Sequence, residues 1–245
     1  MRDVTSPPAS TPRTARALAR EAITHEILAA ARARLAEDGP AALSLRAVAR
    51  DVGMVSSAVY RYVENRDALL TALIVECYDE LGAAVEDAEA AVADRADVTS
   101  RWLAACRAVR TWSVTHPGEF RLLYGTPVPG YAAPPDTIDP ATRLVLVLVA
   151  VVADAHDDGA VPPLSPTAQG DLTELVAGAR DFVAARGLIE DAPPELVVRT
   201  LMAWTTVLGT VSFEMFGHLA NTVSDPEAWF DVVALRLAAD LGIGL

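Results

Sequence analysis

The segment SLRAVARDVGMVSSAVYRYV, residues 44–63, decides the fold of this chain. Its apolar residues recur at helical spacing on both sides of Gly53, which predicts two short helices joined by a tight turn. Two helices that cross closely need a small residue in the first, a turn residue that tolerates a positive φ, and a branched apolar anchor in the second. Ala49, Gly53 and Val59 meet these requirements in that order. The segment is therefore predicted to be a helix-turn-helix.

The second predicted helix carries polar groups away from its anchor Val59. These groups are two serine hydroxyls, a tyrosine hydroxyl and a guanidinium, on Ser56, Ser57, Tyr60 and Arg61. Hydroxyls bind phosphate oxygens and base edges, and arginine forms paired hydrogen bonds with guanine. The pattern indicates double-stranded DNA as a partner, and a merely solvated helical hairpin is the alternative. Ser44 is expected to cap the first helix with its side chain.

Residues 21–74 resemble the DNA-binding domain of the TetR family of transcriptional repressors. That family has a first helix ending in glycine, a helix-turn-helix, two aromatic residues closing the recognition helix, and a basic residue opening a long helix. The matching parts here are 23–37 with Gly39, the pair Tyr60 and Tyr62, and Arg66 before the sequence DALL. The resemblance implies an all-α fold, in which an N-terminal three-helix helix-turn-helix domain precedes a larger helical domain for effector binding and dimerisation.

We expect DNA contacts from the recognition helix and from two arginines that hold phosphates at neighbouring helix starts. The residues are Arg46, Ser56, Ser57, Tyr60, Arg61, Tyr62 and Arg66. Two positions depart from the family pattern, because Val55 replaces a capping serine and Val63 replaces a phenylalanine. Ser56 is expected to take over the capping. Val55 also leaves open a helical dimeric interaction protein without DNA binding.

Charge is divided unevenly along the chain. Residues 1–66 hold 10 Arg and 7 acidic residues, a balance of +3, whereas residues 67–245 hold 10 Arg and 26 acidic residues, a balance of −16. A weakly basic head on an acidic body orients the molecule on a polyanion such as DNA. We assign 1–15, which is rich in Pro, Ser and Thr, to a disordered arm, 16–66 to the DNA-binding domain, and 67–245 to the effector-binding and dimerisation domain.

The composition is typical of a soluble cytoplasmic protein. The N-terminal segment lacks the apolar core of a secretory signal. The apolar run at 144–153 falls short of the roughly 20 residues that span a membrane. We therefore expect no membrane partner, and a helix at 144–153 that is buried on every side. Cys77 and Cys106 lie in apolar helical runs and are expected in the core.

The remainder of the chain is predicted to be helical. Asn65 is expected to cap a long helix that joins the DNA-binding domain to the body. Further helices are expected at 99–115, 119–124, 194–219 and 226–241, and proline and glycine predict a long loop over 125–140.

The stretch HPGEFRLLYGTPVPGYAAP, residues 116–134, resembles the ligand-binding domain of an actinobacterial-type branch of the TetR family. The resemblance implies a small-molecule effector between the central helices, and plain core packing is the alternative for each candidate. The candidates are Trp102, Trp112, Phe120, Tyr124, Tyr131, Met202 and Phe213. Glu119 and Glu214 would favour a cationic effector.

The resemblance also implies a homodimer built from the last two helices. Their apolar surface exceeds what one internal contact consumes, and small residues in the first of them permit a close approach. The expected interface residues are Leu208, Gly209, Ser212, Phe230, Val233 and Leu237. An internal core alone is the alternative.

An enzyme finds little support in the sequence. There is no glycine-rich phosphate loop, no G-x-S-x-G elbow and no H-E-x-x-H motif. Asp154, His156, Asp157 and Asp158 resemble a metal cluster, yet a solvated helix end explains them better. We therefore expect no catalytic residues, no metal and no cofactor, and we keep a metal-dependent enzyme as the least favoured alternative.

Overall fold

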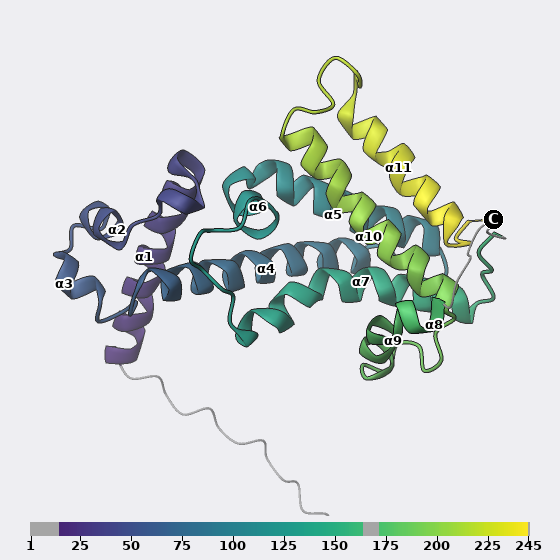
Figure 1. Ribbon diagram of the computed structural model, residues 1–245, viewed down its shortest axis with the longest axis horizontal. Helices are drawn as coiled ribbons and strands as arrows, with labels where there is room; N and C mark the ends of the chain where they lie inside the picture. The colour runs from purple at the N-terminus through teal and green to yellow at the C-terminus, as the bar shows by residue number, and fades with distance from the viewer. Residues whose placement is uncertain (1–14, 164–171, 245) are drawn as a thin grey trace, which may run out of the picture.

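The computed structural model describes residues 15–163 and 172–244, and all regular structure within them is helical (Figure 1). The predicted arm at 1–15 lies outside the described residues apart from Ala15. Short 3-10 turns, η1 (Pro40–Ala42) and η2 (Pro135–Thr137), separate some of the helices. The α-helices are α1 (Ala15–Asp38), α2 (Leu45–Asp51), α3 (Ser56–Val59), α4 (Arg66–Ala90), α5 (Val98–Thr115), α6 (Pro117–Tyr124), α7 (Ile138–Asp157), α8 (Leu172–Leu175), α9 (Ala177–Ala184), α10 (Pro194–Met215) and α11 (Pro226–Asp240).

Two parts of the molecule are joined by α4 (Figure 1). Helices α1, α2 and α3 form a head at one end, and α4 runs from it through the body, where it packs on α5 and α7. Helices α10 and α11 both pack on α5. Helix α6 contacts α1 as well as α4 and α5, so the body touches the head a second time.

One apolar core closes the head. Ile27, Val48 and Val59, from α1, α2 and α3, are fully buried, and Ala49 is 1% exposed. Gly53 has a φ of 67°, a left-handed conformation that favours glycine. The small residue, the turn glycine and the branched anchor predicted from the sequence are all confirmed.

The helix caps follow the sequence prediction only in part. The Asn65 side chain accepts a hydrogen bond from the backbone N–H of Ala68 at 2.8 Å, as expected. Ser44 occupies the N-cap of α2 without a side-chain bond, and α3 begins at Ser56 with Val55 as its N-cap. The predicted capping roles of Ser44 and Ser56 are therefore wrong, because Ser44 makes no such bond and Ser56 is already inside its helix.

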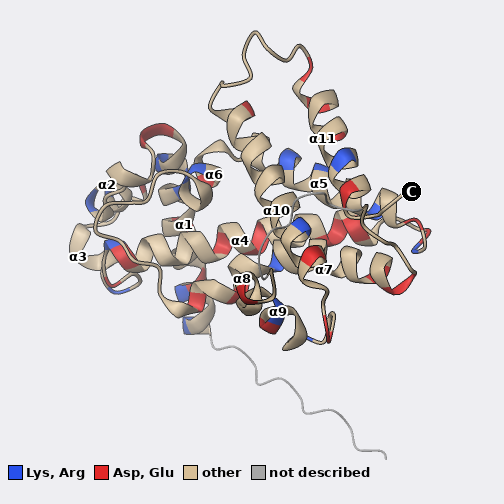
Figure 2. Ribbon diagram, turned by 45° about the vertical axis from the view of Figure 1, so that its right-hand side comes forward, with Lys and Arg blue, Asp and Glu red and all other residues tan. Residues whose placement is uncertain are grey.

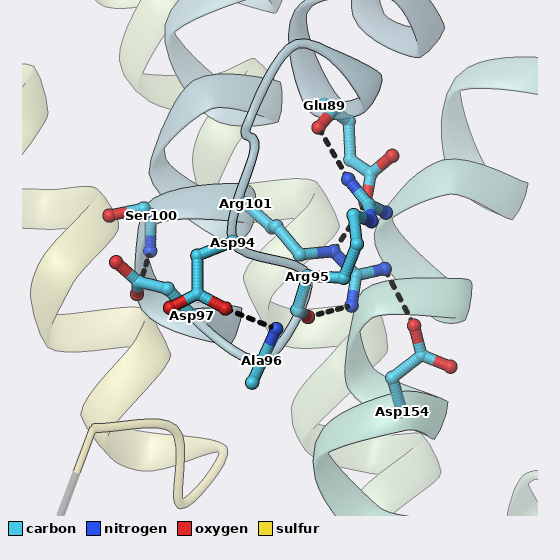
Figure 3. A network of polar contacts seen from close by, with 8 residues as sticks. All are labelled: Glu89, Asp94, Arg95, Ala96, Asp97, Ser100, Arg101 and Asp154. Atoms are coloured by element: carbon cyan, nitrogen blue, oxygen red, sulfur yellow. Dashed lines mark hydrogen bonds and ion pairs between the residues drawn. The ribbon is translucent and has the colours of Figure 1, made fainter.

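A buried arginine fastens three helices of the body together (Figure 3). Arg101 of α5 donates to Glu89 of α4 at 2.5 Å and to Asp154 of α7 at 2.6 Å, and also to the carbonyl of Arg95 at 3.1 Å. Burial alone would raise the pKa of Glu89, but hydrogen bonds from Arg101 and Arg95 lower it below its usual value.

Within the described residues, no group of three or more His, Cys, Asp or Glu is placed to hold a metal ion.

The apolar run predicted to be buried on every side forms the middle of α7. Leu144, Leu148 and Val152 are buried, whereas Leu146 and Val147 are half-exposed. The prediction of burial all round is wrong, because this side of α7 lines an open groove together with arginine and glutamate side chains.

Both cysteines are core residues, as predicted. Cys77 and Cys106 are fully buried. Burial raises the pKa of the Cys77 thiol to about 12 and that of Cys106 above its usual value, so both remain unreactive thiols at neutral pH.

Candidate nucleic-acid interface

The outer side of α3 and the turn that follows it presents the predicted recognition residues. Tyr60 is 50% exposed, and Ser57 and Arg61 are also exposed. Val59 and Val63 are buried in the head core, which fixes the orientation of this turn. A phenol, a hydroxyl and a guanidinium therefore reach solvent within about one helical turn, as contacts to phosphates and base edges require. Ser56 is only half-exposed.

The two arginines expected on phosphates have different environments. Arg46 is exposed in the first turn of α2, with Arg50 exposed on the same helix. The Arg66 guanidinium instead donates to three backbone carbonyls within the head, those of Leu43, Pro40 and Ala41, at 2.9, 3.1 and 3.0 Å. These bonds engage Nε and one terminal nitrogen of Arg66, so its main role in the structure is to hold the head together, and its contact with phosphate stays a prediction.

Helix α1 adds basic side chains beside the recognition helix. The Arg20 guanidinium lies 5.4 Å from the centre of the Tyr62 ring, and a surface hollow is lined by Arg16, Ala19, Arg20, Ile23, Arg61 and Tyr62. Tyr62 is half-buried, so it supports this hollow more than it projects from it. The sequence signal for the hollow is the spacing of Arg16 and Arg20, which places them on one face of a helix.

An ion pair neutralises an acidic group of the head. Arg34 of α1 forms a two-pronged pair with Asp51 of α2, with one hydrogen bond of 2.9 Å to Oδ1 and a second to Oδ2. The Arg34 guanidinium holds the pKa of Asp51 below its usual value. This pair fixes α2 on α1 and removes a negative charge that would repel DNA.

The net charge differs between the head and the body. Figure 2 shows basic and acidic segments in both parts, with a basic segment of α2 at the outer end of the molecule. Residues 1–66 carry a balance of +3 and residues 67–245 a balance of −16. A polyanion is therefore attracted to the end that carries α2 and α3.

The residues expected around an effector do not share one cavity. Trp102 and Phe120 are fully buried, and the Trp102 indole donates to the carbonyl of Ala234 at 2.9 Å. Trp112 is buried and stacks on His116. Met202 and Phe213 are each 56% exposed. Trp102, Trp112 and Phe120 are therefore core residues and Met202 and Phe213 face solvent, so the structure does not gather these five side chains around one cavity, and their contact with an effector stays a prediction.

The remaining two candidates lie near each other on the side of α4. Tyr131 lines a hollow with Tyr78, and its hydroxyl lies 2.9 Å from that of Thr71. Tyr124 packs edge to face on Tyr78, with ring centres 6.0 Å apart. Glu214, expected from the sequence to attract a cationic effector, is engaged by Arg110 at 2.9 and 2.7 Å.

The last two helices expose a different apolar set from the one predicted. Phe230 is 1% exposed and belongs to the main core of the single chain, so it offers little surface to a second copy. Leu208, Gly209, Ser212, Val233 and Leu237 are half-exposed. The most exposed apolar side chains of these helices are Met202, Phe213, Phe216, Trp229, Val232 and Leu235.

Two family models and several known proteins match this chain. The model of bacterial regulatory proteins of the tetR family matches residues 27–73, and the model of the tetracyclin repressor-like C-terminal domain matches residues 102–237. HTH-type transcriptional regulators of Mycobacterium bovis and Mycobacterium tuberculosis are 39% identical over 226 residues, which cover 91% of this chain and 94% of each relative.

Solved structures share the same arrangement of helices. The regulatory protein SCO4313 superposes with a TM-score of 0.72 at 28% identity, over 93% of this chain and 98% of that one. The fatty acid degradation regulator FadR from Bacillus halodurans has a TM-score of 0.61 at 13% identity, over 90% and 98% of the two chains, which shows the likeness of fold alone.

Proposed function

Because the chain belongs to the TetR family, and so is a DNA-binding transcriptional regulator and not an enzyme, we propose that it is a cytoplasmic, dimeric repressor that a small molecule releases from its operator. The observation that carries the proposal is the exposed group of Ser57, Tyr60 and Arg61 on a helix-turn-helix with a closed apolar core. These side chains are the candidate contacts to DNA, with Arg46 on the neighbouring helix.

Exposed apolar side chains on α10 and α11 support a second copy of this chain as the partner, because no described part of the chain covers them. By length and composition α10 could cross a membrane, although core helices of soluble proteins also pass this test. Only 39% of its apolar stretch is buried within the described protomer. Its exposed face continues onto α11 at Trp229, across a hollow lined by Thr206, Gly209, Thr210, Phe213, Leu219 and Trp229. A second copy seated on this face would bury these groups and present two recognition helices.

Two recognition helices fit the demands of DNA better than one. A single short helix reads few bases, and paired half-sites about 34 Å apart multiply specificity. Helix α6 offers a route for release, because it contacts both α1 and the body. In the proposed dimer, one spacing of the two heads matches the half-sites on DNA and another does not. An effector releases DNA only if it binds the second arrangement more tightly, so DNA must weaken effector binding by the same factor.

Footprinting of the purified protein on the DNA that flanks its own gene tests the proposal. We expect two protected half-sites about one helical turn apart, related by a two-fold axis. The alternative of an interaction protein without DNA binding has one supporting observation, the uncapped start of α3 at Val55, which is 71% exposed. Absence of any protected sequence, in protein that is folded and dimeric, would favour that alternative.

A further inference from the structure

An apolar cavity lies between α7, α9 and α10, away from the residues that the sequence suggested for an effector. It occupies about 70 Å³. Its lining consists of Val145, Leu148, Val149, Val152, Ala179, Phe182, Val183, Ile189, Ala192, Leu196, Val197, Thr200, Leu201 and Trp204. No charged side chain is among them, so an ion bound there would lose its hydration without gaining a partner.

One lining residue carries a polar group that the fold leaves unsatisfied. The Trp204 indole Nε1 is buried, and within the described residues nothing accepts its hydrogen bond. The other polar side chain, that of Thr200, already donates to the carbonyl of Leu196 at 2.8 Å. A buried indole N–H usually finds a partner, because leaving it unpaired is costly.

A water molecule is a poor hydrogen-bond partner for this indole N–H. A buried water typically needs two to four polar partners, and apolar cavities without them stay dry. Among the described lining residues, the Trp204 indole is the one side-chain donor without a partner. An occupant that buries hydrocarbon against the valines and leucines and offers a single acceptor fits better.

The wall formed by α9 can yield to such an occupant. Val149, Val176, Val183, Ala192 and Val197 form a small cluster separate from the main core. The cavity is smaller than the roughly 150 Å³ cavity that accepts benzene, so a ring-sized molecule must displace a wall. Moving α9 disturbs only the small cluster, whereas moving α7 would disturb the main core.

We propose that this cavity binds a small, uncharged, mostly hydrocarbon molecule whose one hydrogen-bond acceptor takes the indole N–H of Trp204. Such a molecule would be the effector of the regulator, and that consequence rests on the proposed function. Binding itself does not, so the test uses the free protein without DNA. Failure of the operator experiment would therefore leave this inference standing, and the reverse also holds.

The test compares two probes of nearly the same shape, cyclohexanone and methylenecyclohexane, on wild-type protein and on Trp204→Phe. Affinities come from titrations followed by NMR with ¹⁵N-labelled tryptophan, and the indole signal of Trp204 is identified by its absence in the variant. Because the two probes differ in hydration, the informative quantity is the ratio of their dissociation constants. Trp204→Phe should shift that ratio about fivefold against the ketone, the size expected for one hydrogen bond. Cyclohexanone should also move the Trp204 indole proton downfield.

Two further measurements guard against misfolding and non-specific binding. Ala179→Leu fills the cavity and should abolish binding of both probes, whereas Ala184→Leu, an exposed position on the same helix, should leave binding unchanged. Cyclohexanecarboxylate should not bind. An unchanged ratio in Trp204→Phe, unchanged binding in Ala179→Leu, or equal binding of the carboxylate would each overturn the inference.

Discussion

At the scale of single residues, the head shows how one residue type serves two purposes. Arg46 and Arg66 both stand at the start of a helix, and the sequence treats them alike. In the structure Arg46 is exposed, whereas Arg66 crosses to three carbonyls around η1. A guanidinium held by carbonyls contributes to the stability of the domain, and a free one is available to DNA.

Replacing these two arginines should therefore change different properties, the stability of the domain for Arg66 and the binding of DNA for Arg46. Arg66→Ala removes hydrogen bonds to three carbonyls and should lower the free energy of unfolding by about 1–3 kcal/mol. Arg46→Ala should leave that free energy within about 0.5 kcal/mol of wild type. It should instead reduce the log–log salt slope of operator binding by about one. Denaturant titration and binding at several salt concentrations measure both. A stable Arg66→Ala protein with a reduced salt slope would support the phosphate role.

The recognition surface gives a second prediction at this scale. Tyr60→Ala and Arg61→Ala remove exposed groups outside the head core, so folding should be unaffected. Each should weaken operator binding by about fivefold or more, since a good base contact is worth about 1–3 kcal/mol. Electrophoretic shift gives the affinity and circular dichroism the helical content. If both variants keep wild-type affinity, α3 does not read DNA as proposed.

Residue roles are predictable from the sequence wherever they depend on the local backbone. Asn65 caps α4 through a bond to a residue three positions away, and Gly53 needs only its own turn. The role of Arg66 depends on carbonyls 23 to 26 residues earlier in the chain, which periodicity does not reveal. Trp229 and Phe230 are neighbouring aromatic residues that the sequence does not distinguish, and the packing of the whole body leaves Trp229 exposed and buries Phe230.

At the scale of elements, α6 is the second connection between body and head. Gly118 in its first turn lies against α1, where a Cβ would come within 2.9 Å of the Ala36 backbone nitrogen. Glycine is therefore needed for the close approach of these two helices. The cavity between α7, α9 and α10 shows the limit of sequence reasoning at this scale, because its lining comes from segments up to about 60 residues apart.

Substituting Gly118 tests whether the contact between α6 and α1 couples the body to the head. Gly118→Ala forces α6 away from α1 and should cost about 1–3 kcal/mol of stability through overpacking. It should also change operator affinity by altering how the head sits on the body. Gly178→Ala is the matched control, because it lies in α9 with nothing within 4 Å of the added Cβ. The control should be neutral or stabilising by up to about 1 kcal/mol. Thermal unfolding and electrophoretic shift distinguish the two, and equal behaviour would show that α6 and α1 are not tightly coupled.

At the scale of the whole molecule, the described residues leave an apolar face over α10 and α11 at a distance from the DNA-binding end (Figure 1). The sequence predicts excess apolar surface on these two helices, and the structure changes which side chains compose it. Gly209 lies half-exposed in the hollow on this face, and a Cβ added to it would meet nothing within 4 Å. A facing helix from a second copy can therefore approach there closely.

An arginine at Gly209 tests the assembly. In a single chain Gly209→Arg meets open space, so the folded protomer should persist. In the proposed dimer the same change places an unpaired charge between two helices, which should cost several kcal/mol. Sedimentation at micromolar concentration should show a monomer, and operator affinity should fall steeply because the two heads are no longer linked. Ala184→Arg, exposed on α9, is the control and should remain dimeric. A Gly209→Arg protein that stays dimeric would place the interface elsewhere while leaving the fold and the DNA-binding head untouched.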